Sequence, residues 1–234
     1  LNYSDRIIMA RFLSMDIVGT YSIAYTGGLV LNIIINAFNS TWIPIFNNLM
    51  ESDRSDKFEV VKKRLTDLII LIITFCLFGQ LFAKEVITLI LPASYNSVIS
   101  FLPFVLFGIV FAGINHFFND IFIYNKDTKF LPLFSLIAVI VNVSLNFIFI
   151  PIFGALVAAI STIIAFLIQT MILIIMVKIK YEGYKFQYLK IIVILIFSMN
   201  PILLYLLNRG IGFHTIVLKT IYFTIFIGIF GKRF

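Results

Sequence analysis

Ionisable side chains stand inside long apolar stretches of this sequence, where a charge is expensive. The residues concerned are Asp5, Arg6, Arg11, His116, Asp120 and Lys219. A charged side chain at the middle of a bilayer costs at least about 2.5–3.5 kcal/mol on insertion scales, so such groups usually mark substrate paths or ion paths. If the apolar stretches cross a membrane, the sequence predicts a charged site within it.

The basic members of this set suggest a site for an anion. Arg6, Arg11 and Lys219 are predicted to bind a negatively charged substrate, and Asp5 stands beside Arg6 as a local partner. A long basic side chain can also extend along the helix to reach the membrane surface. That alternative stays open for Arg11, and for Lys219 about seven residues inside the edge of its stretch.

The acidic members suggest a site for a coupling ion. His116 and Asp120 are four residues apart, so a helix would place both on one face. Histidine titrates near neutral pH, and a neighbouring carboxylate shifts that titration. We predict that Asp5, His116 and Asp120 bind a proton or a sodium ion. The alternative for Asp120 is simple hydration, because it lies within about a turn or so of the predicted membrane boundary at Asn125.

A polar stripe accompanies these groups. Asn32, Asn36 and Asn39 recur at spacings of three to four, which places them along one side of a helix. We predict that they line a polar cavity. Hydrogen bonding between neighbouring helices is the alternative, since amide side chains commonly join helices within membranes.

The overall composition supports placing these residues in lipid. The 234 residues are 61% hydrophobic and 12% charged, with a mean hydropathy of +1.07. Soluble domains have about 45–50% apolar and 25% charged residues. Backbone polar groups in lipid must form helices or a closed barrel, and a barrel would alternate apolar and polar residues. Continuous runs such as 131–153 therefore predict helices.

The clusters of charged residues divide the chain into spans. The expected spans lie near 19–50, 66–83, 99–124, 130–152, 155–177, 190–208 and 212–230, after a partial helix at 1–14. The fold class is therefore predicted to be all-α, a polytopic helical bundle of about seven full transmembrane helices plus the end of an eighth. Because the chain begins with Leu and with an incomplete helix, we expect residues 1–234 to form a single transmembrane domain of a longer protein.

Basic residues predict the orientation of the bundle. Thirteen of the eighteen Lys and Arg residues fall at 51–65, 125–129, 178–190 and in the tail. Short connections rich in Lys and Arg remain in the cytoplasm. These connections and the C-terminus are therefore predicted to be cytoplasmic.

Several function classes are excluded by what the sequence lacks. It has no phosphate-binding glycine loop, no nucleophile beside a base and no cluster of residues at metal-ligand spacing. We therefore expect no catalytic residues, no cofactor and no metal centre. The formal charge of +7 lies mainly in connections between spans rather than on a solvated aromatic surface, so we expect no nucleic-acid partner.

Several motifs, in order and spacing, carry a family resemblance. They are the segments 5–8 (DRII) and 18–25 (VGTYSIAY), Pro44 near the end of a long helix, 91–95 (LPASY), the pair Asn142 and Asn146, the turn 150–155 (IPIFGA), and Ala158-Ala159. Together they resemble the second half of bacterial polysaccharide flippases, the O-antigen (Wzx-type) branch of the MOP (MATE-like) transporter superfamily. The resemblance covers essentially the whole chain, although Ala155-Leu156-Val157 stands where the family usually has a glycine.

The resemblance implies a fold and a function. The fold would be a two-lobe transporter of fourteen helices in the inner membrane, with this chain as the C-terminal lobe. The function would be to flip polyprenyl-pyrophosphate-linked oligosaccharides for O-antigen or capsular polysaccharide synthesis. The implied partners are the lipid-linked oligosaccharide, membrane lipid, and a glycan polymerase with its chain-length regulator. A cation-coupled drug or metabolite antiporter and a non-transporting scaffold for glycan assembly are the alternatives.

Overall fold

The computed structural model describes residues 3–184, 186, 195–196 and 213–230, and its regular structure there is helical. The α-helices are α1 (Ser4–Phe12), α2 (Met15–Glu51), α3 (Lys57–Ile90), α4 (Val98–Tyr124), α5 (Leu131–Phe153), α6 (Leu156–Lys180) and α9 (Phe213–Phe230), with short 3₁₀ helices η1 (Ala93–Tyr95) and η2 (Thr128–Phe130). The helices α2 to α6 are long and apolar enough to cross a membrane. The predicted all-α, multi-pass membrane fold is therefore confirmed.

The number of full spans differs from the expected seven. Among the described residues, five helices meet the length and hydropathy of a span, and α9 adds a largely apolar helix of eighteen residues. The expected span near 190–208 lies mostly outside the described residues. The described part of the chain therefore supports five spans plus α9, and the division into seven spans stays a prediction.

Two helices extend well beyond their apolar stretches. Where the sequence predicts a span at 66–83, α3 runs from Lys57 to Ile90 and includes residues assigned to the flanking connections. Lys, Arg and Glu are good helix formers, so a helix continues through them although hydropathy falls. The helix α2 has 37 residues and continues through Pro44. At 1.5 Å per residue it is about 55 Å long, well over the ~30 Å of a hydrocarbon core.

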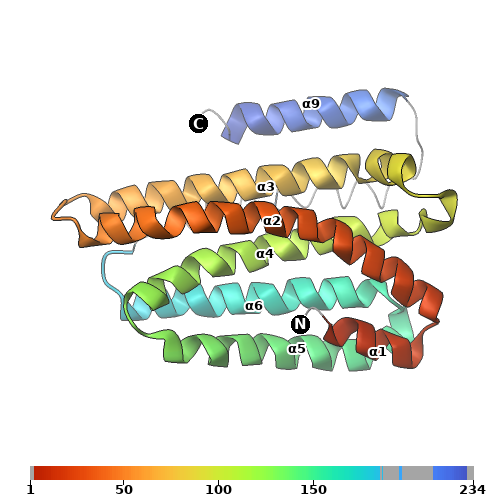
Figure 1. Cartoon of the computed structure of the whole chain (residues 1–234), viewed down its shortest axis with the longest axis horizontal. Coiled ribbons are helices and arrows are strands. Elements are labelled where there is room, and N and C mark those ends of the chain that lie inside the picture. Colours follow the sequence, from red (N-terminus) through yellow and green to blue (C-terminus); the bar gives the residue numbers. More distant parts are fainter. Residues whose placement is uncertain (1–2, 185, 187–194, 197–212, 231–234) are drawn as a thin grey trace.

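The helices lie side by side and alternate in direction from α2 to α6 (Figure 1). One end of the bundle, here named the basic end, carries the connections at 52–56 and 125–130 and the C-terminus of α6. The opposite end carries the connection from α1 to α2, η1, and the turn from α5 to α6. That turn is tight because Gly154 takes a left-handed backbone conformation with φ of 79° directly after α5.

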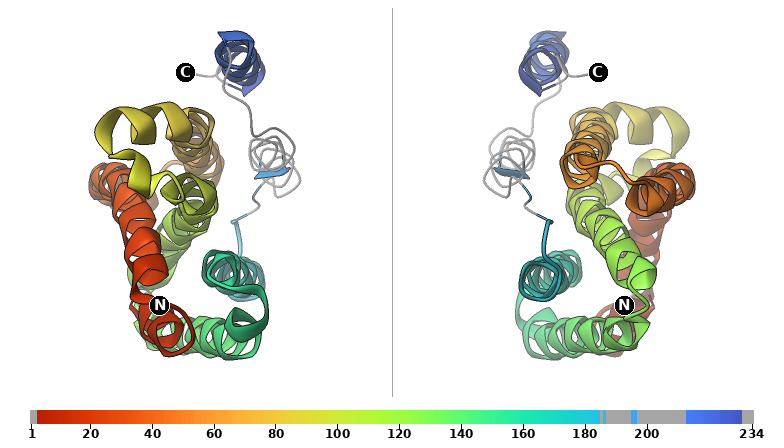
Figure 2. Two further views of the ribbon diagram at one scale, coloured as in Figure 1. Left: turned by 90° about the vertical axis from the view of Figure 1, so that its right-hand side faces the viewer. Right: turned by 90° about the vertical axis from the view of Figure 1, so that its left-hand side faces the viewer.

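The helix α4 is the centre of the bundle. It packs against α2, α3 and α6, while α5 covers α6 and α1 lies against α5 and α2 (Figure 2). Its side chains are buried around most of its circumference, as expected of a helix surrounded by others. Close approach of α2 needs Gly28, where a Cβ atom would lie 2.7 Å from Ile109 Cδ1 and 2.8 Å from Val105 Cγ1. At the end of the bundle opposite the basic end, α1, α2, α5 and α6 lie close together.

Asp127 joins two connections at the basic end and gives that end an acid-sensitive contact. Lys180 Nζ and the Tyr181 hydroxyl each lie 2.7 Å from Asp127 Oδ2. The hydrogen bond from Lys180, followed by that from Tyr181, lowers the pKa of Asp127 below its ordinary range. A lowered folded-state pKa adds stability above the unfolded pKa of about 3.9, and that stability is lost as pH falls through the folded value.

We therefore expect acid to weaken this contact in the wild type but not in Asp127→Asn. Protection of the amide hydrogens of residues 125–131 and 178–184, relative to their intrinsic exchange rates at each pH, should fall below about pH 4 in the wild type, because protonated Asp127 no longer pairs with Lys180. In Asp127→Asn the protection should already be low at pH 7 and should change less on acidification. Equal pH dependence in the two proteins would contradict the assignment.

Candidate functional site

Asp5 is the centre of a buried polar cluster near the end of the bundle that lies opposite the basic end. Its side chain is 1% exposed. Asn146 Nδ2 of α5 donates to Asp5 Oδ1 at 2.7 Å, and Thr162 Oγ1 of α6 donates to Asp5 Oδ2 at 2.9 Å. The Tyr21 hydroxyl of α2 lies 3.4 Å from the same Oδ2. Four helices therefore converge on one carboxylate.

Local sequence features explain why these groups meet. Asp5 lies in the first turn of α1, where the unpaired backbone N–H groups favour negative charge. Asn142 and Asn146 are four residues apart and share the buried face of α5. On α6, Ala158 and Ala159 are almost fully buried, and small side chains of this kind let helices approach closely within a membrane.

A second layer of hydrogen bonds surrounds the carboxylate. Asn142 Nδ2 donates to Ser161 Oγ at 3.3 Å and to Thr162 Oγ1 at 3.1 Å. Asn146 Nδ2 also lies 3.3 Å from Asn142 Oδ1, and Ser161 Oγ donates to Asn146 Oδ1. Within the described ranges, every hydrogen-bond partner of Asp5 is an uncharged amide or hydroxyl. The cluster therefore fixes the carboxylate without balancing its charge.

This donor set is suited to a small monovalent cation or a proton. Carboxylate, amide and hydroxyl oxygens are the ligands that hard cations prefer, and rotation of the amides would present their oxygens. One carboxylate supplies one negative charge, which one monovalent cation neutralises and a divalent cation exceeds. No group of three or more His, Cys, Asp or Glu that could hold a metal occurs in the described part of the chain.

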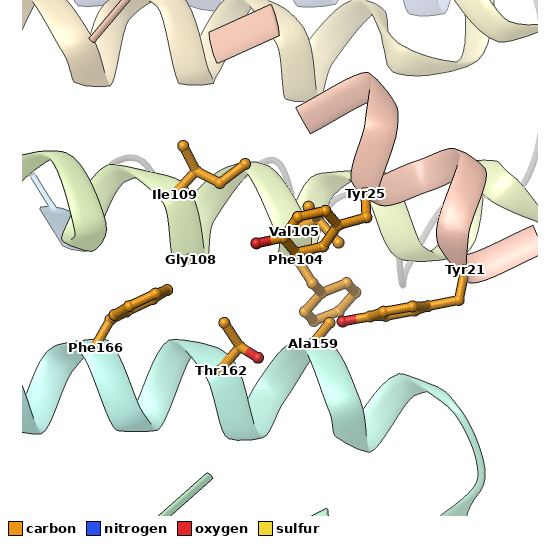
Figure 3. A pocket seen from close by; sticks show the side chains of 9 residues that line it. All are labelled: Tyr21, Tyr25, Phe104, Val105, Gly108, Ile109, Ala159, Thr162 and Phe166. Atoms are coloured by element: carbon orange, nitrogen blue, oxygen red, sulfur yellow. The ribbon is translucent and has the colours of Figure 1, made fainter. Parts of the chain in front are cut away.

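A small pocket lies beside the cluster. Figure 3 shows Tyr21 and Tyr25 from α2, Phe104 and Gly108 from α4, and Thr162 from α6 around it, and Val105, Ile109, Ala159 and Phe166 complete the lining. Tyr21 and Thr162 line this pocket and also contact Asp5. An ion in the pocket would therefore meet two Asp5 partners before it reached the carboxylate.

Arg6 stands next to Asp5 on α1 and is half-buried. Its guanidinium carbon lies 5.2 Å from the ring centroid of Tyr25 and 5.8 Å from that of Tyr3. Arg6 Nε is buried without a hydrogen-bond partner. Guanidinium N–H groups bind phosphate oxygens in pairs, so Arg6 has the chemistry to bind an anionic group beside the pocket.

The structure does not bring the three predicted anion-binding residues together. Arg11 is exposed in the last turn of α1. Lys219 lies on α9, and its Nζ is 2.7 Å from Glu85 Oε1 of α3. Sequence reasoning missed Glu85 because it was assigned to a connection, whereas it lies inside α3. Lys219 is therefore largely neutralised by an acid, and of the three residues only Arg6 lies beside the Asp5 cluster.

The Lys219 and Glu85 side chains form an ion pair that joins α9 to α3. Both are about three-quarters buried. Removal of one partner leaves a partly buried charge, so Lys219→Met or Glu85→Gln alone should destabilise the protein more than the double variant does. A double-mutant cycle on thermal unfolding should give a coupling energy of about 1 kcal/mol. Additive single effects would show that the pair contributes nothing.

The three predicted ion-coupling residues fall in two different places. Asp120 lies in the last turns of α4, near the basic end and away from Asp5. His116 is exposed whereas Asp120 is buried, and the structure gives no hydrogen bond between them among the described residues. Spacing of four residues put them on adjacent positions of α4, but the packing of neighbouring helices covers only one of them.

The asparagine stripe on α2 is only partly buried. Asn32 and Asn39 are half-buried, Asn36 is exposed, and Asn39 Oδ1 lacks a hydrogen-bond partner. The stripe therefore does not line the pocket, which α2 lines with Tyr21 and Tyr25. Sequence reasoning used Asn142 and Asn146 only for the resemblance, although two amides four residues apart in an apolar run are themselves a signal of a buried polar contact.

Comparisons with known proteins agree with this architecture. No family model and no curated protein matches the sequence. Among solved structures, the chain is similar to "Lipid II flippase MurJ, inward closed conformation", with a TM-score of 0.71 and 17% sequence identity. The match covers 98% of this chain and 50% of the flippase chain, so the chain spans about half its length. The chain therefore shares the fold of about half of that structure.

Proposed function

We propose that the native protein containing this chain flips polyprenyl-pyrophosphate-linked oligosaccharides across the bacterial inner membrane, for O-antigen or capsular polysaccharide synthesis. The observation that carries this proposal is the likeness of 98% of the chain to half of a lipid II flippase. The O-antigen assignment rests on the motifs around Asn142 and Pro151. A glycan polymerase and a chain-length regulator are the partners of that pathway.

Arg6 is the proposed contact for the pyrophosphate. The substrate is anionic and must cross about 30 Å of hydrocarbon, so a basic group near the path lowers the cost of its charge. Arg6 has a buried Nε without a partner and lies against Tyr25, which lines the pocket. Arg11 and Lys219 are less suited to bind the pyrophosphate, because Arg11 is exposed and Lys219 is paired with Glu85.

The Asp5 cluster is the proposed coupling site. Binding a cation to Asp5 would satisfy the buried charge and tie α1 to α2, α5 and α6. A ligand shifts a conformational equilibrium by its difference in affinity between two states. A cation that binds only when these four helices are together would therefore favour one state of a two-lobe transporter that alternates its access.

The basic connections support an orientation. Arg54, Lys57, Lys126 and Lys129 lie at the same end of the bundle as the last turn of α6, which adds Lys178 and Lys180. Excess Lys and Arg in short connections favours the cytoplasm. The basic end is therefore proposed to face the cytoplasm, with the C-terminus on the same side.

Genetic complementation tests the proposed function. The full native polypeptide is expressed in a bacterial strain that lacks its own O-antigen flippase, and surface polysaccharide is measured together with protein level. Wild type should restore polysaccharide, and Asp5→Asn should not. Failure of the wild type at normal protein level would overturn the flippase proposal, and full activity of Asp5→Asn would overturn the proposed role of Asp5.

A cation-coupled antiporter is the second candidate, because a buried carboxylate such as Asp5 is a common means of coupling to an ion. Proteoliposomes containing the full polypeptide separate the two functions. Efflux of a cationic dye driven by a sodium or proton gradient, without translocation of the glycolipid, would favour the antiporter. The half-buried arginine beside the pocket argues against a cationic substrate.

A further inference from the structure

The helices α2 and α4 run in the same direction (Figure 1) and pack against each other, and two contacts in their second halves have the same register. Ile35 packs on Gly113, where a Cβ atom would lie 2.9 Å from Ile35 Cδ1. Nearer the basic end, the rings of Phe46 and Tyr124 have centroids 5.5 Å apart. In both pairs the two residue numbers differ by 78. That register places Trp42 opposite Asp120, on the same faces and between the two contacts.

Both of these side chains are buried with an unsatisfied polar atom. Trp42 is 3% exposed and Asp120 is 7% exposed. Trp42 Nε1, a hydrogen-bond donor, and Asp120 Oδ2, an acceptor, have no hydrogen-bond partner. Unpaired buried polar atoms are rare in proteins, and each calls for an explanation such as a bound water or ion. Here a donor and an acceptor lie at one level of one interface.

Hydrogen-bond counting indicates a water between the helices. A water accepts from an indole N–H and donates to carboxylate or amide oxygens, so it would satisfy both Trp42 and Asp120. Two more acceptors at this level, Asn39 Oδ1 and Asn119 Oδ1, are also buried without partners. Acceptors outnumber donors among these atoms, so an additional hydrogen is needed. A proton on Asp120 would supply it.

A count of the charged groups around Asp120 also indicates that it binds a proton. The sequence of α2 has no charged residue between Asp16 and Glu51. The described charged or titratable groups at this level on the other segments that pack against α4, and on α4 itself, are Lys62, Lys63, Arg64, Asp67, Lys178, Tyr181, Tyr184, His116 and Tyr124. Lys62 pairs with Glu59, and Lys63, Arg64, Lys178 and His116 are exposed. The structure gives Asp120 no ion-pair partner among the described residues, so none of these residues compensates its charge.

We propose that Asp120 binds one proton at a second site, through a water held by Trp42 Nε1 near the basic end of the bundle. In the binding step an O–H bond of hydronium breaks, Asp120 Oδ2 forms a new O–H bond, and a neutral water remains. The site is separate from the Asp5 cluster, which lies near the other end of the bundle. The proposal stands apart from the proposed function, because it needs no glycolipid.

Trp42 provides the probe for this site, since it is the one tryptophan among the 234 residues. In the full native polypeptide with Trp42 as the sole tryptophan retained, emission is recorded between pH 4 and pH 9 at constant ionic strength. The wild type should show a change in intensity that follows the binding of one proton. Asp120→Asn should remove that change, and Asp120→Glu should keep it at a shifted midpoint.

Matched variants identify the group that titrates. His116→Gln and Asp5→Asn should retain the response, because His116 is exposed and Asp5 lies near the other end of the bundle. Exchange of NaCl for KCl at fixed pH should leave the emission unchanged. A response that survives in Asp120→Asn, or a response to sodium that Asp120→Asn removes, would overturn the proposal. Infrared absorption gives an independent readout, because a protonated carboxyl band should be missing in Asp120→Asn even if its fluorescence is altered by misfolding.

Discussion

Asp5→Asn is expected to abolish stabilisation of the protein by a small cation. Asparagine preserves the size of the side chain and can still accept one of the two hydrogen bonds from Asn146 and Thr162, but it removes the charge that holds the cation. A cation present at a hundred times its Kd stabilises the folded state by about 2.7 kcal/mol. The variant should lose this contribution in full.

Thermal unfolding of the purified full polypeptide measures this effect. Unfolding is compared in sodium chloride and in choline chloride at equal ionic strength and pH. The wild type should unfold at a higher temperature in sodium, and Asp5→Asn should unfold at one temperature in both salts. Asp16→Asn, in an exposed acid of α2, is the matched control and should behave as the wild type. An undiminished sodium effect in Asp5→Asn would contradict the coupling site.

Arg6→Ala is expected to reduce glycolipid translocation at least tenfold at unchanged protein level. Hydrogen bonds to charged groups contribute about 1.5–3 kcal/mol, and each 1.4 kcal/mol is a factor of ten. Arg6→Lys should restore only part of the rate, because lysine keeps the charge but lacks the planar pair of donors. The translocation rate should therefore be highest with arginine at position 6, lower with lysine and lowest with alanine.

A control separates this effect from general loss of positive charge. Arg54 is exposed at the basic end and pairs with Asp56. Arg54→Ala removes one positive charge without touching the pocket, so it should leave translocation within about twofold of the wild type, since exposed ion pairs contribute little. Equal losses in Arg6→Ala and Arg54→Ala would mean that Arg6 has no specific role in binding the substrate.

The membrane fold could be predicted from sequence because the signal for it is local. Long apolar runs and backbone hydrogen bonding leave helices as the structure, and the five spanning helices follow those runs. The ends of α3 could not be predicted in the same way. Hydropathy indicates where the hydrocarbon region ends, whereas α3 continues beyond that point through residues such as Lys62 and Glu85. The length of each helix therefore exceeds its apolar stretch.

The candidate site could be predicted only in part because its contacts join distant residues. The sequence indicates that Asp5 and Arg6 are unusual, since each is a charge in an apolar context. It does not indicate that Asn146 and Thr162, more than 140 positions away, are the partners of Asp5. The pairing of Lys219 with Glu85 was missed for the same reason. Such contacts depend on which helices pack together.

Translocation in proteoliposomes tests the central claim most directly. The full native polypeptide is reconstituted in vesicles that contain a fluorescent polyprenyl-pyrophosphate oligosaccharide, and an external reagent quenches the label in the outer leaflet. The account predicts that wild-type protein makes nearly all of the label accessible, while over the same interval Asp5→Asn and Arg6→Ala leave close to half of it protected in the inner leaflet, near the level in protein-free vesicles. Wild-type vesicles that protect as much label as protein-free vesicles would contradict it.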